Sequence, residues 1–183
     1  MLKKNLFSNF TGQIYSAIAN FLILPQYLKI LGPESFGLIG IYLLLQPIFL
    51  ILDGGLLQSI FREIARLGLS NEKSKEIRDL LRSVEILISL IAIFIIFTGV
   101  ALKDYISTNW ININELDINS VENSFLCITI LIALRLIEGI YRNTLLGLQK
   151  QSLYNLIFIL YTTLKTFGVL IFLKFFISPN ITN

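Results

Sequence analysis

The chain has 183 residues, of which 55% are hydrophobic and 15% are charged, and its formal net charge is +3. Soluble domains contain about 25% charged residues, so this composition excludes an ordinary soluble domain and indicates a membrane protein. No histidine is present, which removes the most common metal ligand and proton carrier. We therefore expect no metal and no cofactor. The single cysteine, Cys127, lies in an apolar segment, so disulfides give no information about the cellular compartment.

Five apolar stretches are long enough to cross a bilayer, which takes about 20 helical residues. They are continuous and rich in leucine and isoleucine, unlike the alternating strands of a transmembrane barrel. The sequence thus predicts an all-α integral membrane protein, with residues 1–183 forming a single transmembrane helical region. In chain order, the predicted spans are residues 9–31, 37–60, 84–102, 122–145 and 153–177.

The distribution of lysine and arginine predicts the orientation in the membrane. If the N-terminus is cytoplasmic, ten of these cations lie on the inner side and three on the outer side, as the positive-inside rule favours. The net positive charge then follows from topology and gives no reason to expect a nucleic-acid partner. The inner cations are Lys3, Lys4, Arg62, Arg66, Lys73, Lys75, Arg78, Arg82, Arg142 and Lys150.

The first two spans each carry a stripe of polar residues. A helix advances by about 100° per residue, which places these polar residues on one face of each span. They can contact a ligand, or they can hydrogen-bond neighbouring helices in a purely structural role. The first stripe consists of Asn9, Gln13, Ser16 and Asn20, and the second of Tyr42, Gln46 and Asp53.

The fourth and fifth spans carry ionisable residues near their middles. Arg135 and Lys165 fall close to the expected midplane, where inserting each charge costs about 2.5 to 3.5 kcal/mol. Arg135 shares a helical face with Glu138 and Arg142, so an ion pair along the helix is expected. The span of Lys165 contains no acidic residue. Cations at this depth indicate a water-filled cavity or an anionic ligand, and the alternative is a structural ion-pair cluster.

Asp53 lies near the inner end of the second span, directly before two glycines. Its carboxylate can accept hydrogen bonds from the backbone of Gly54 and Gly55, or it can pair with Arg62 or Arg66. Both of these roles are structural, and they fit a residue close to the membrane boundary.

No catalytic motif is found along the chain. The sequence lacks a P-loop and the HExxH, GxSxG and CxxC patterns. A membrane enzyme would need a catalytic constellation, typically in a large outer loop, and the longest outer connection, 103–120, is short. We therefore expect that the protein is not an enzyme.

Three segments occur in the order found in a known family: LPQYLKILGPESFGLIGIY (24–42), LDGGLLQSIFREIAR (52–66) and YRNTLLGLQKQSLYNLI (141–157). They resemble bacterial polysaccharide biosynthesis exporters, the Wzx-type O-antigen and capsule flippases of the multidrug/oligosaccharidyl-lipid/polysaccharide (MATE-like) superfamily. The resemblance implies a multi-pass protein of the bacterial inner membrane. It also implies transport of an undecaprenyl-diphosphate-linked oligosaccharide between leaflets by alternating access.

The resemblance further implies roles for the polar residues and for partners. Arg135 and Lys165 would attract the diphosphate or acidic sugars, and Glu138 would hold Arg135 in place. The implied partners are the lipid bilayer, the lipid-linked oligosaccharide, and the polysaccharide polymerase with its chain-length machinery. The remaining implied roles are sugar contacts by Gln13, Asn20 and Gln46, and a gate or ion-coupling site at Asp53 and Arg62.

The chain departs from this family in its number of spans. Family members have at least about twelve spans in two bundles that rock against each other, and five are predicted here. We therefore expect that the chain is the N-terminal part of one bundle. Three explanations follow: it belongs to a longer transporter, it is a truncated product, or it needs partners. The alternative functions are a multidrug-type exporter of the same superfamily and an inactive remnant.

Overall fold

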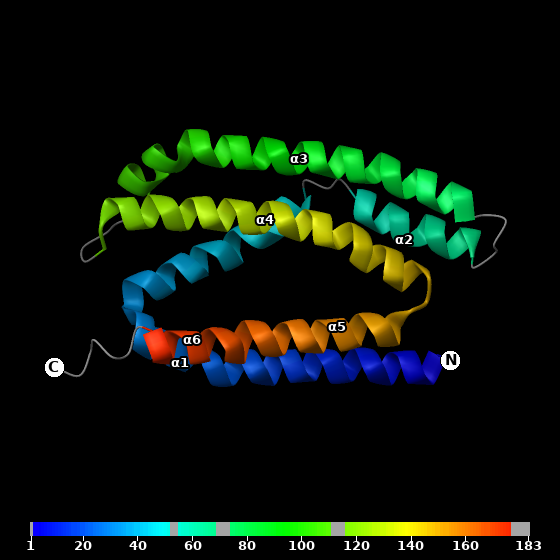
Figure 1. Cartoon of the computed structure of the whole chain (residues 1–183), viewed down its shortest axis with the longest axis horizontal. Helices are drawn as coiled ribbons and strands as arrows, with labels where there is room; N and C mark the ends of the chain where they lie inside the picture. The colour runs from blue at the N-terminus through cyan, green and yellow to red at the C-terminus, as the bar shows by residue number, and fades with distance from the viewer. Residues whose placement is uncertain (1, 52–54, 69–73, 111–115, 177–183) are drawn as a thin grey trace. The chain divides into compact units, whose positions relative to one another are not determined.

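The computed structural model describes residues 2–51, 55–68, 74–110 and 116–176 (Figure 1). Within these residues every regular element is helical, which confirms the predicted all-α class. The elements are α1 (Leu2–Ile51), α2 (Leu56–Leu67), α3 (Ser74–Asn109), α4 (Ile118–Gly147), α5 (Gln151–Thr163), the π-helical turn η2 (Leu164–Gly168) and α6 (Val169–Phe176).

A break at Gly32 divides α1 into two helices. Gly32 has φ 78° and ψ 167°, a conformation that glycine adopts more readily than any other residue. Pro33 follows directly and lacks the N–H that a continuing helix would use. The apolar part of α1, Phe10–Ile48, is 39 residues long, about twice the length that one crossing needs. The break therefore lies between the first two predicted spans.

The helix bounds differ from the predicted second span, 37–60. Helix α1 ends at Ile51, Gly55 takes a left-handed conformation with φ 80°, and α2 begins at Leu56. Helix α2 is amphipathic, because its buried residues Leu57, Ile60, Ile64 and Leu67 recur every three or four positions. A hydropathy window averages across Gly55, so it cannot register a change of backbone direction there.

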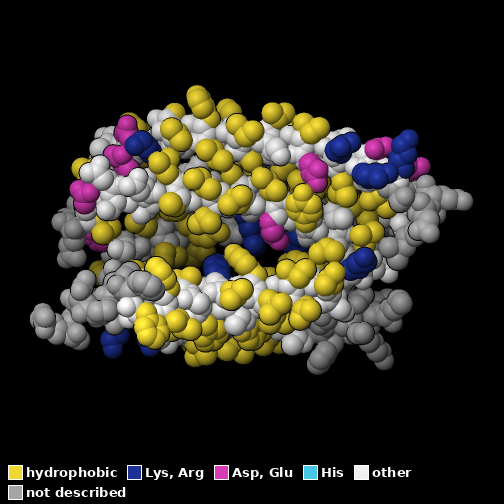
Figure 2. Space-filling view, in the orientation of Figure 1, with side chains coloured by type: hydrophobic (Ala, Val, Ile, Leu, Met, Phe, Trp, Pro, Cys, Tyr) yellow, Lys and Arg dark blue, Asp and Glu magenta, His cyan; other side chains and the backbone are white. Residues whose placement is uncertain are grey.

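Four helical stretches in the described residues are long and apolar enough to span a membrane. Large hydrophobic side chains are exposed along them, and Figure 2 shows these in yellow over most of the visible face. Phe21, for example, is 79% exposed. Such surface suits lipid as its solvent, so the chain is a multi-pass membrane protein. The stretches are Phe10–Ile48, Lys75–Asn109, Ile118–Gly147 and Gln151–Phe175.

The chain forms two compact units. Unit 1 comprises residues 1–36 and 150–183, and unit 2 comprises residues 37–149. In unit 2, α3 and α4 lie side by side and antiparallel (Figure 1), because Gly99 faces Thr129 while Glu85, nearer the start of α3, accepts a hydrogen bond from Tyr141 near the end of α4 (3.0 Å). The core of unit 2 forms between these helices and α2.

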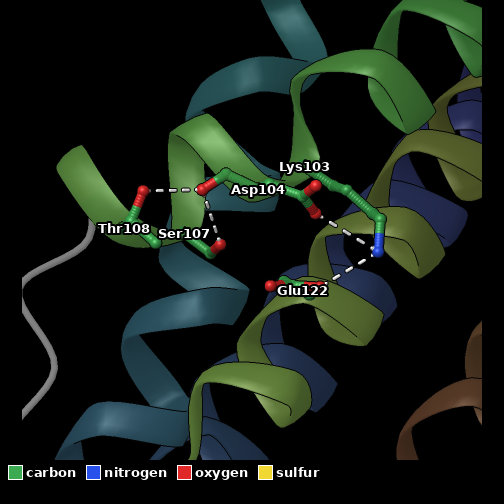
Figure 3. Close-up of polar contacts among 5 residues, drawn as sticks. All are labelled: Lys103, Asp104, Ser107, Thr108 and Glu122. Carbon is green, nitrogen blue, oxygen red and sulfur yellow. Dashed lines mark hydrogen bonds and ion pairs between the residues drawn. The ribbon is translucent and has the colours of Figure 1, made fainter.

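A charged cluster ties α3 to α4 at the end where these two helices are connected (Figure 3). Lys103 Nζ lies 3.0 Å from Glu122 Oε2 on α4 and 3.3 Å from Asp104 Oδ1 on its own helix. The Asp104 carbonyl accepts hydrogen bonds from the hydroxyls of Ser107 (3.1 Å) and Thr108 (2.7 Å). One lysine thus bridges the two helices and faces two carboxylates.

In unit 1, the first half of α1 runs parallel to α5 and α6. Gly12 lies against Asn155 and Phe158, and Tyr27, farther along α1, contacts the backbone of Thr166, farther along the other helix. Ala19, between them, is 3% exposed. The parallel direction agrees with two helices that cross the membrane in the same sense, as predicted for the first and fifth spans.

Candidate functional site

The expected ion pair is present on α4 in unit 2. Arg135 Nη1 lies 3.4 Å from Glu138 Oε2, and the two side chains are 30% and 43% exposed. Glu138 Oε2 is covered and accepts no hydrogen bond from any described residue. Because a guanidinium has five N–H donors, a single carboxylate does not saturate it. Arg135 therefore keeps the capacity to bind an anion.

Residues of α1 and α2 lie near α4 within unit 2. Ile48 near the end of α1 lines the same cavity as Ile132 of α4, and Leu57 near the start of α2 packs on Gly139. Arg135 lies between Ile132 and Gly139 in the sequence. Helices α1 and α2 are separate helices, and interrupted helices are common at the binding sites of transporters.

The other predicted residues of unit 2 are more dispersed. Gln46 is half-buried on α1. Arg62 is exposed on α2 and donates to Ser59 Oγ at 3.4 Å. Arg66 pairs with Glu63 on the same helix, and this hydrogen bond raises the pKa of Arg66. Asp53 lies outside the described residues, so its predicted role as a gate or ion-coupling group stays a prediction.

Lys165 belongs to unit 1, where the backbone forms the π-helical turn η2. Tyr27 of α1 donates its hydroxyl to the carbonyl of Thr166 at 2.9 Å and approaches the carbonyl of Lys165 at 3.3 Å. Single π-helical turns inside α-helices leave the regular hydrogen-bond ladder and occur often at functional sites. Tyr27 therefore supports the backbone that carries Lys165.

The hydrogen bonds from α1 to α5 and to η2 define two sides of the interface. Tyr15 bonds to Thr163 Oγ1 at 2.6 Å, and Tyr27 reaches the Lys165 carbonyl. On α1, Tyr15 and Tyr27 lie on opposite flanks of the face that holds Ala19, by the rotation of about 100° per residue. The two tyrosines thus mark opposite edges of the packed face.

Gln13 and Asn20 fall on the Tyr27 flank of α1, and Lys165 falls on the matching flank of the neighbouring helix. Gln13, Asn20 and Lys165 are all exposed. Asn20 donates to the Ser16 carbonyl at 2.8 Å. Gly12 lies against Asn155 and Phe158, so these residues are at the same depth. Asn20 follows Gly12 by eight residues, and the turn that holds Lys165 follows residues 155–158 by the same number. Asn20 and Lys165 therefore share a side and a depth in unit 1.

Sequence reasoning missed the polar interface of unit 1. Asn155, Thr162 and Thr166 are buried at 5%, 4% and 2% exposure, and Thr166 donates to the Thr162 carbonyl at 2.6 Å. Their spacing of seven and four residues places all three on one helical face. That periodicity was a usable signal for a buried polar face, although it did not identify Tyr27 as the partner.

Within the part of the chain that the structure describes, no group of three or more His, Cys, Asp or Glu side chains could hold a metal ion. Arg135 in unit 2 and Lys165 in unit 1 are cations near the middle of their apolar helical stretches, and each unit also carries polar side chains. In each unit taken by itself, a cation with polar side chains suits an anionic, hydroxyl-rich ligand.

Comparison with known proteins gives one family. A family model described as "Polysaccharide biosynthesis protein" matches residues 2–182. No curated protein and no solved structure gives a significant match.

Proposed function

The chain belongs to the polysaccharide biosynthesis protein family, and from this membership we propose that it takes part in exporting a lipid-linked oligosaccharide across the membrane. The observation that carries the proposal is the presence of a mid-span cation in each unit. Placing each charge in the membrane costs about 2.5 to 3.5 kcal/mol. A purely structural role would not explain why both units carry such a charge. An anionic cargo explains both residues.

The proposed cargo is an undecaprenyl-diphosphate-linked repeat unit of O-antigen or capsule, as for Wzx-type flippases. Arg135 offers a planar fork of donors to the phosphate oxygens, and Glu138 orients it. Lys165 adds a point charge. Gln13, Asn20 and Gln46 donate and accept hydrogen bonds with sugar hydroxyls.

The proposed mechanism is alternating access in the bacterial inner membrane. The described helices form part of one bundle, and a second bundle closes the pathway on alternate sides. Asp53 and Arg62 act near the inner end of the pathway, as a gate or in ion coupling. The lipid-linked product then passes to a polymerase and its chain-length machinery.

Charge distinguishes this proposal from a multidrug-type exporter. Cationic drugs would be repelled by Arg135 and Lys165, whereas a diphosphate would be attracted. Transport assays that compare a cationic dye with a lipid-linked oligosaccharide separate the two functions. An inactive remnant would leave surface polysaccharide unchanged when its gene is deleted.

The experiment that tests the proposal is complementation of a deletion strain. Arg135→Ala and Lys165→Ala are expected to abolish surface polysaccharide and to leave lipid-linked repeat units at the inner leaflet. Lys174→Ala removes an exposed lysine from the same helical region and is the matched control. Full export by both Arg135→Ala and Lys165→Ala, with normal protein levels, would contradict the proposal.

A further inference from the structure

An apolar cavity of about 630 Å³ lies within unit 2, between the second half of α1, α3 and α4. Its walls are almost entirely aliphatic and aromatic. The two hydroxyls that line it, Thr98 and Thr129, donate to the carbonyls of Phe94 (2.8 Å) and Phe125 (2.9 Å) on their own helices. The volume is typical of ligand sites, and the walls select an apolar occupant.

The cavity extends over the depth of a single leaflet. Its lining along α3 and the residue that follows α3 runs from Phe94 to Trp110, about 24 Å at 1.5 Å per residue. One leaflet with its headgroups measures about 20 to 22 Å. Trp110, which is 77% exposed, marks the interfacial end, where tryptophans are enriched. Phe94 and Ile132 mark the end near the middle of the helices.

We propose that this cavity binds one acyl chain of a membrane phospholipid from the leaflet that borders the connection between α3 and α4. An acyl chain is apolar and spans one leaflet, so it matches the cavity in chemistry and in length. The fixed walls offer it van der Waals contacts that mobile lipid does not. A polyprenyl chain is much longer than one leaflet and fits this depth less well.

Charged residues at the same end of α3 and α4 as Trp110 indicate the class of headgroup. At this end of α3 and α4, Lys103 faces the carboxylates of Asp104 and Glu122 (Figure 3), and Asp117 is exposed at the start of α4. One cation and three anions give these four described residues a net charge of −2 (1 − 3). An ammonium headgroup complements this charge, so phosphatidylethanolamine is favoured over phosphatidylglycerol.

The only tryptophan of the chain provides the measurement, because Trp110 lines the cavity. The chain is reconstituted into mixed phosphatidylethanolamine and phosphatidylglycerol vesicles in which one or the other lipid carries brominated acyl chains that quench tryptophan fluorescence. Brominated phosphatidylethanolamine is expected to quench Trp110 with a binding constant about two- to fivefold higher than that of brominated phosphatidylglycerol. This is the difference that one partly exposed ion pair provides.

Two variants fill the cavity from different walls, and each has a control on the same helix. Thr98→Phe on α3 and Ile48→Phe on α1 add a ring inside the cavity, and both are expected to abolish the excess quenching. Val100→Phe and Leu43→Phe add the same ring at exposed positions that do not line it, and both should quench like the parent chain. Circular dichroism checks folding, and Ile48→Phe decides the matter if Thr98→Phe does not fold.

Three outcomes would overturn the proposal or part of it. Quenching that neither cavity-filling variant changes would show that no lipid chain occupies the cavity, as when another protein segment fills it. Displacement of the brominated phospholipid by small amounts of polyprenyl phosphate would assign the cavity to a polyprenyl chain. If the two brominated lipids quench Trp110 equally, and this quenching is lost in both cavity-filling variants, the cavity binds an acyl chain but does not select the headgroup.

Discussion

Gly99 of α3 and Thr129 of α4 are in such close contact that a Cβ atom added to Gly99 would lie 2.9 Å from the Cβ of Thr129. The Cβ of Thr129 is fixed to the backbone and cannot rotate away. We therefore expect Gly99→Ala to force α3 and α4 apart and to lower the free energy of unfolding by about 1 to 3 kcal/mol. Thermal unfolding of the detergent-solubilised protein measures the change.

Gly37→Ala is the matched control for Gly99→Ala. No atom lies within 4 Å of a Cβ at Gly37, and alanine is favoured over glycine in a helix by about 0.5 to 1 kcal/mol. This variant should be as stable as the parent chain or slightly more stable. If both variants unfold at the same temperature as the parent chain, this result would contradict the close contact between α3 and α4 at Gly99.

The contact between α2 and α4 predicts a substitution that a second change rescues. A Cβ at Gly139 would lie 2.6 Å from Leu57 Cδ1, the flexible end of a side chain. Gly139→Ala should therefore destabilise the protein less than Gly99→Ala does. Shortening the opposing side chain with Leu57→Val should recover part of the loss, so the double-mutant cycle should show a coupling energy of about 0.5 kcal/mol or more. Additive effects would show that the two residues do not touch.

Hydropathy and spacing predicted much of the fold and part of the site. The all-α class followed from continuous apolar runs, and the pair of Arg135 with Glu138 followed from their spacing of three residues. The turn at Gly32 could be read from glycine followed by proline. All of these features depend on residues that are close in the sequence.

The features that escaped prediction depend on the backbone or on distant contacts. The separate helix α2 starts after a left-handed Gly55, and a hydropathy average does not detect that conformation. The π-helical turn at Lys165 is accompanied by the Tyr27 hydroxyl, which lies 138 positions earlier in the chain. No local pattern around Lys165 encodes such a partner.

The contact between Tyr27 and the π-helical turn gives the next prediction. Tyr27→Phe removes the donor to the Thr166 carbonyl and is expected to cost about 0.5 to 1.5 kcal/mol. Amide exchange should increase selectively at residues 165–168, and the Lys165-dependent export should decline with it. Hydrogen–deuterium exchange with mass spectrometry measures the first effect.

Tyr161→Phe provides the comparison. Tyr161 is 51% exposed on α5, the helix that leads into the π-helical turn, and it is not the donor to the Thr166 carbonyl. It should leave exchange at residues 165–168 unchanged. Equal exchange in the Tyr27→Phe variant and the parent chain would mean that the turn persists without the tyrosine.

The predicted orientation can be tested with a membrane-impermeant maleimide, because the chain has one cysteine. In a Cys127→Ser background, Thr108→Cys should be labelled in intact cells, since the α3–α4 connection is predicted to lie outside. Lys150→Cys, in the connection between α4 and α5, should be labelled only after the inner membrane is permeabilised. The positive-inside rule is the reason for this expectation, because the predicted inner segments carry most of the lysines and arginines.

Cys127 of the parent chain is the internal control for this labelling. Its side chain is exposed on α4 within a stretch apolar enough to span the membrane. Lipid should shield it, so labelling is expected only after denaturation in detergent. The reverse pattern, with Lys150→Cys labelled in intact cells and Thr108→Cys protected, would invert the orientation. It would also place the leaflet bordered by Trp110, and hence the proposed lipid cavity, on the cytoplasmic side.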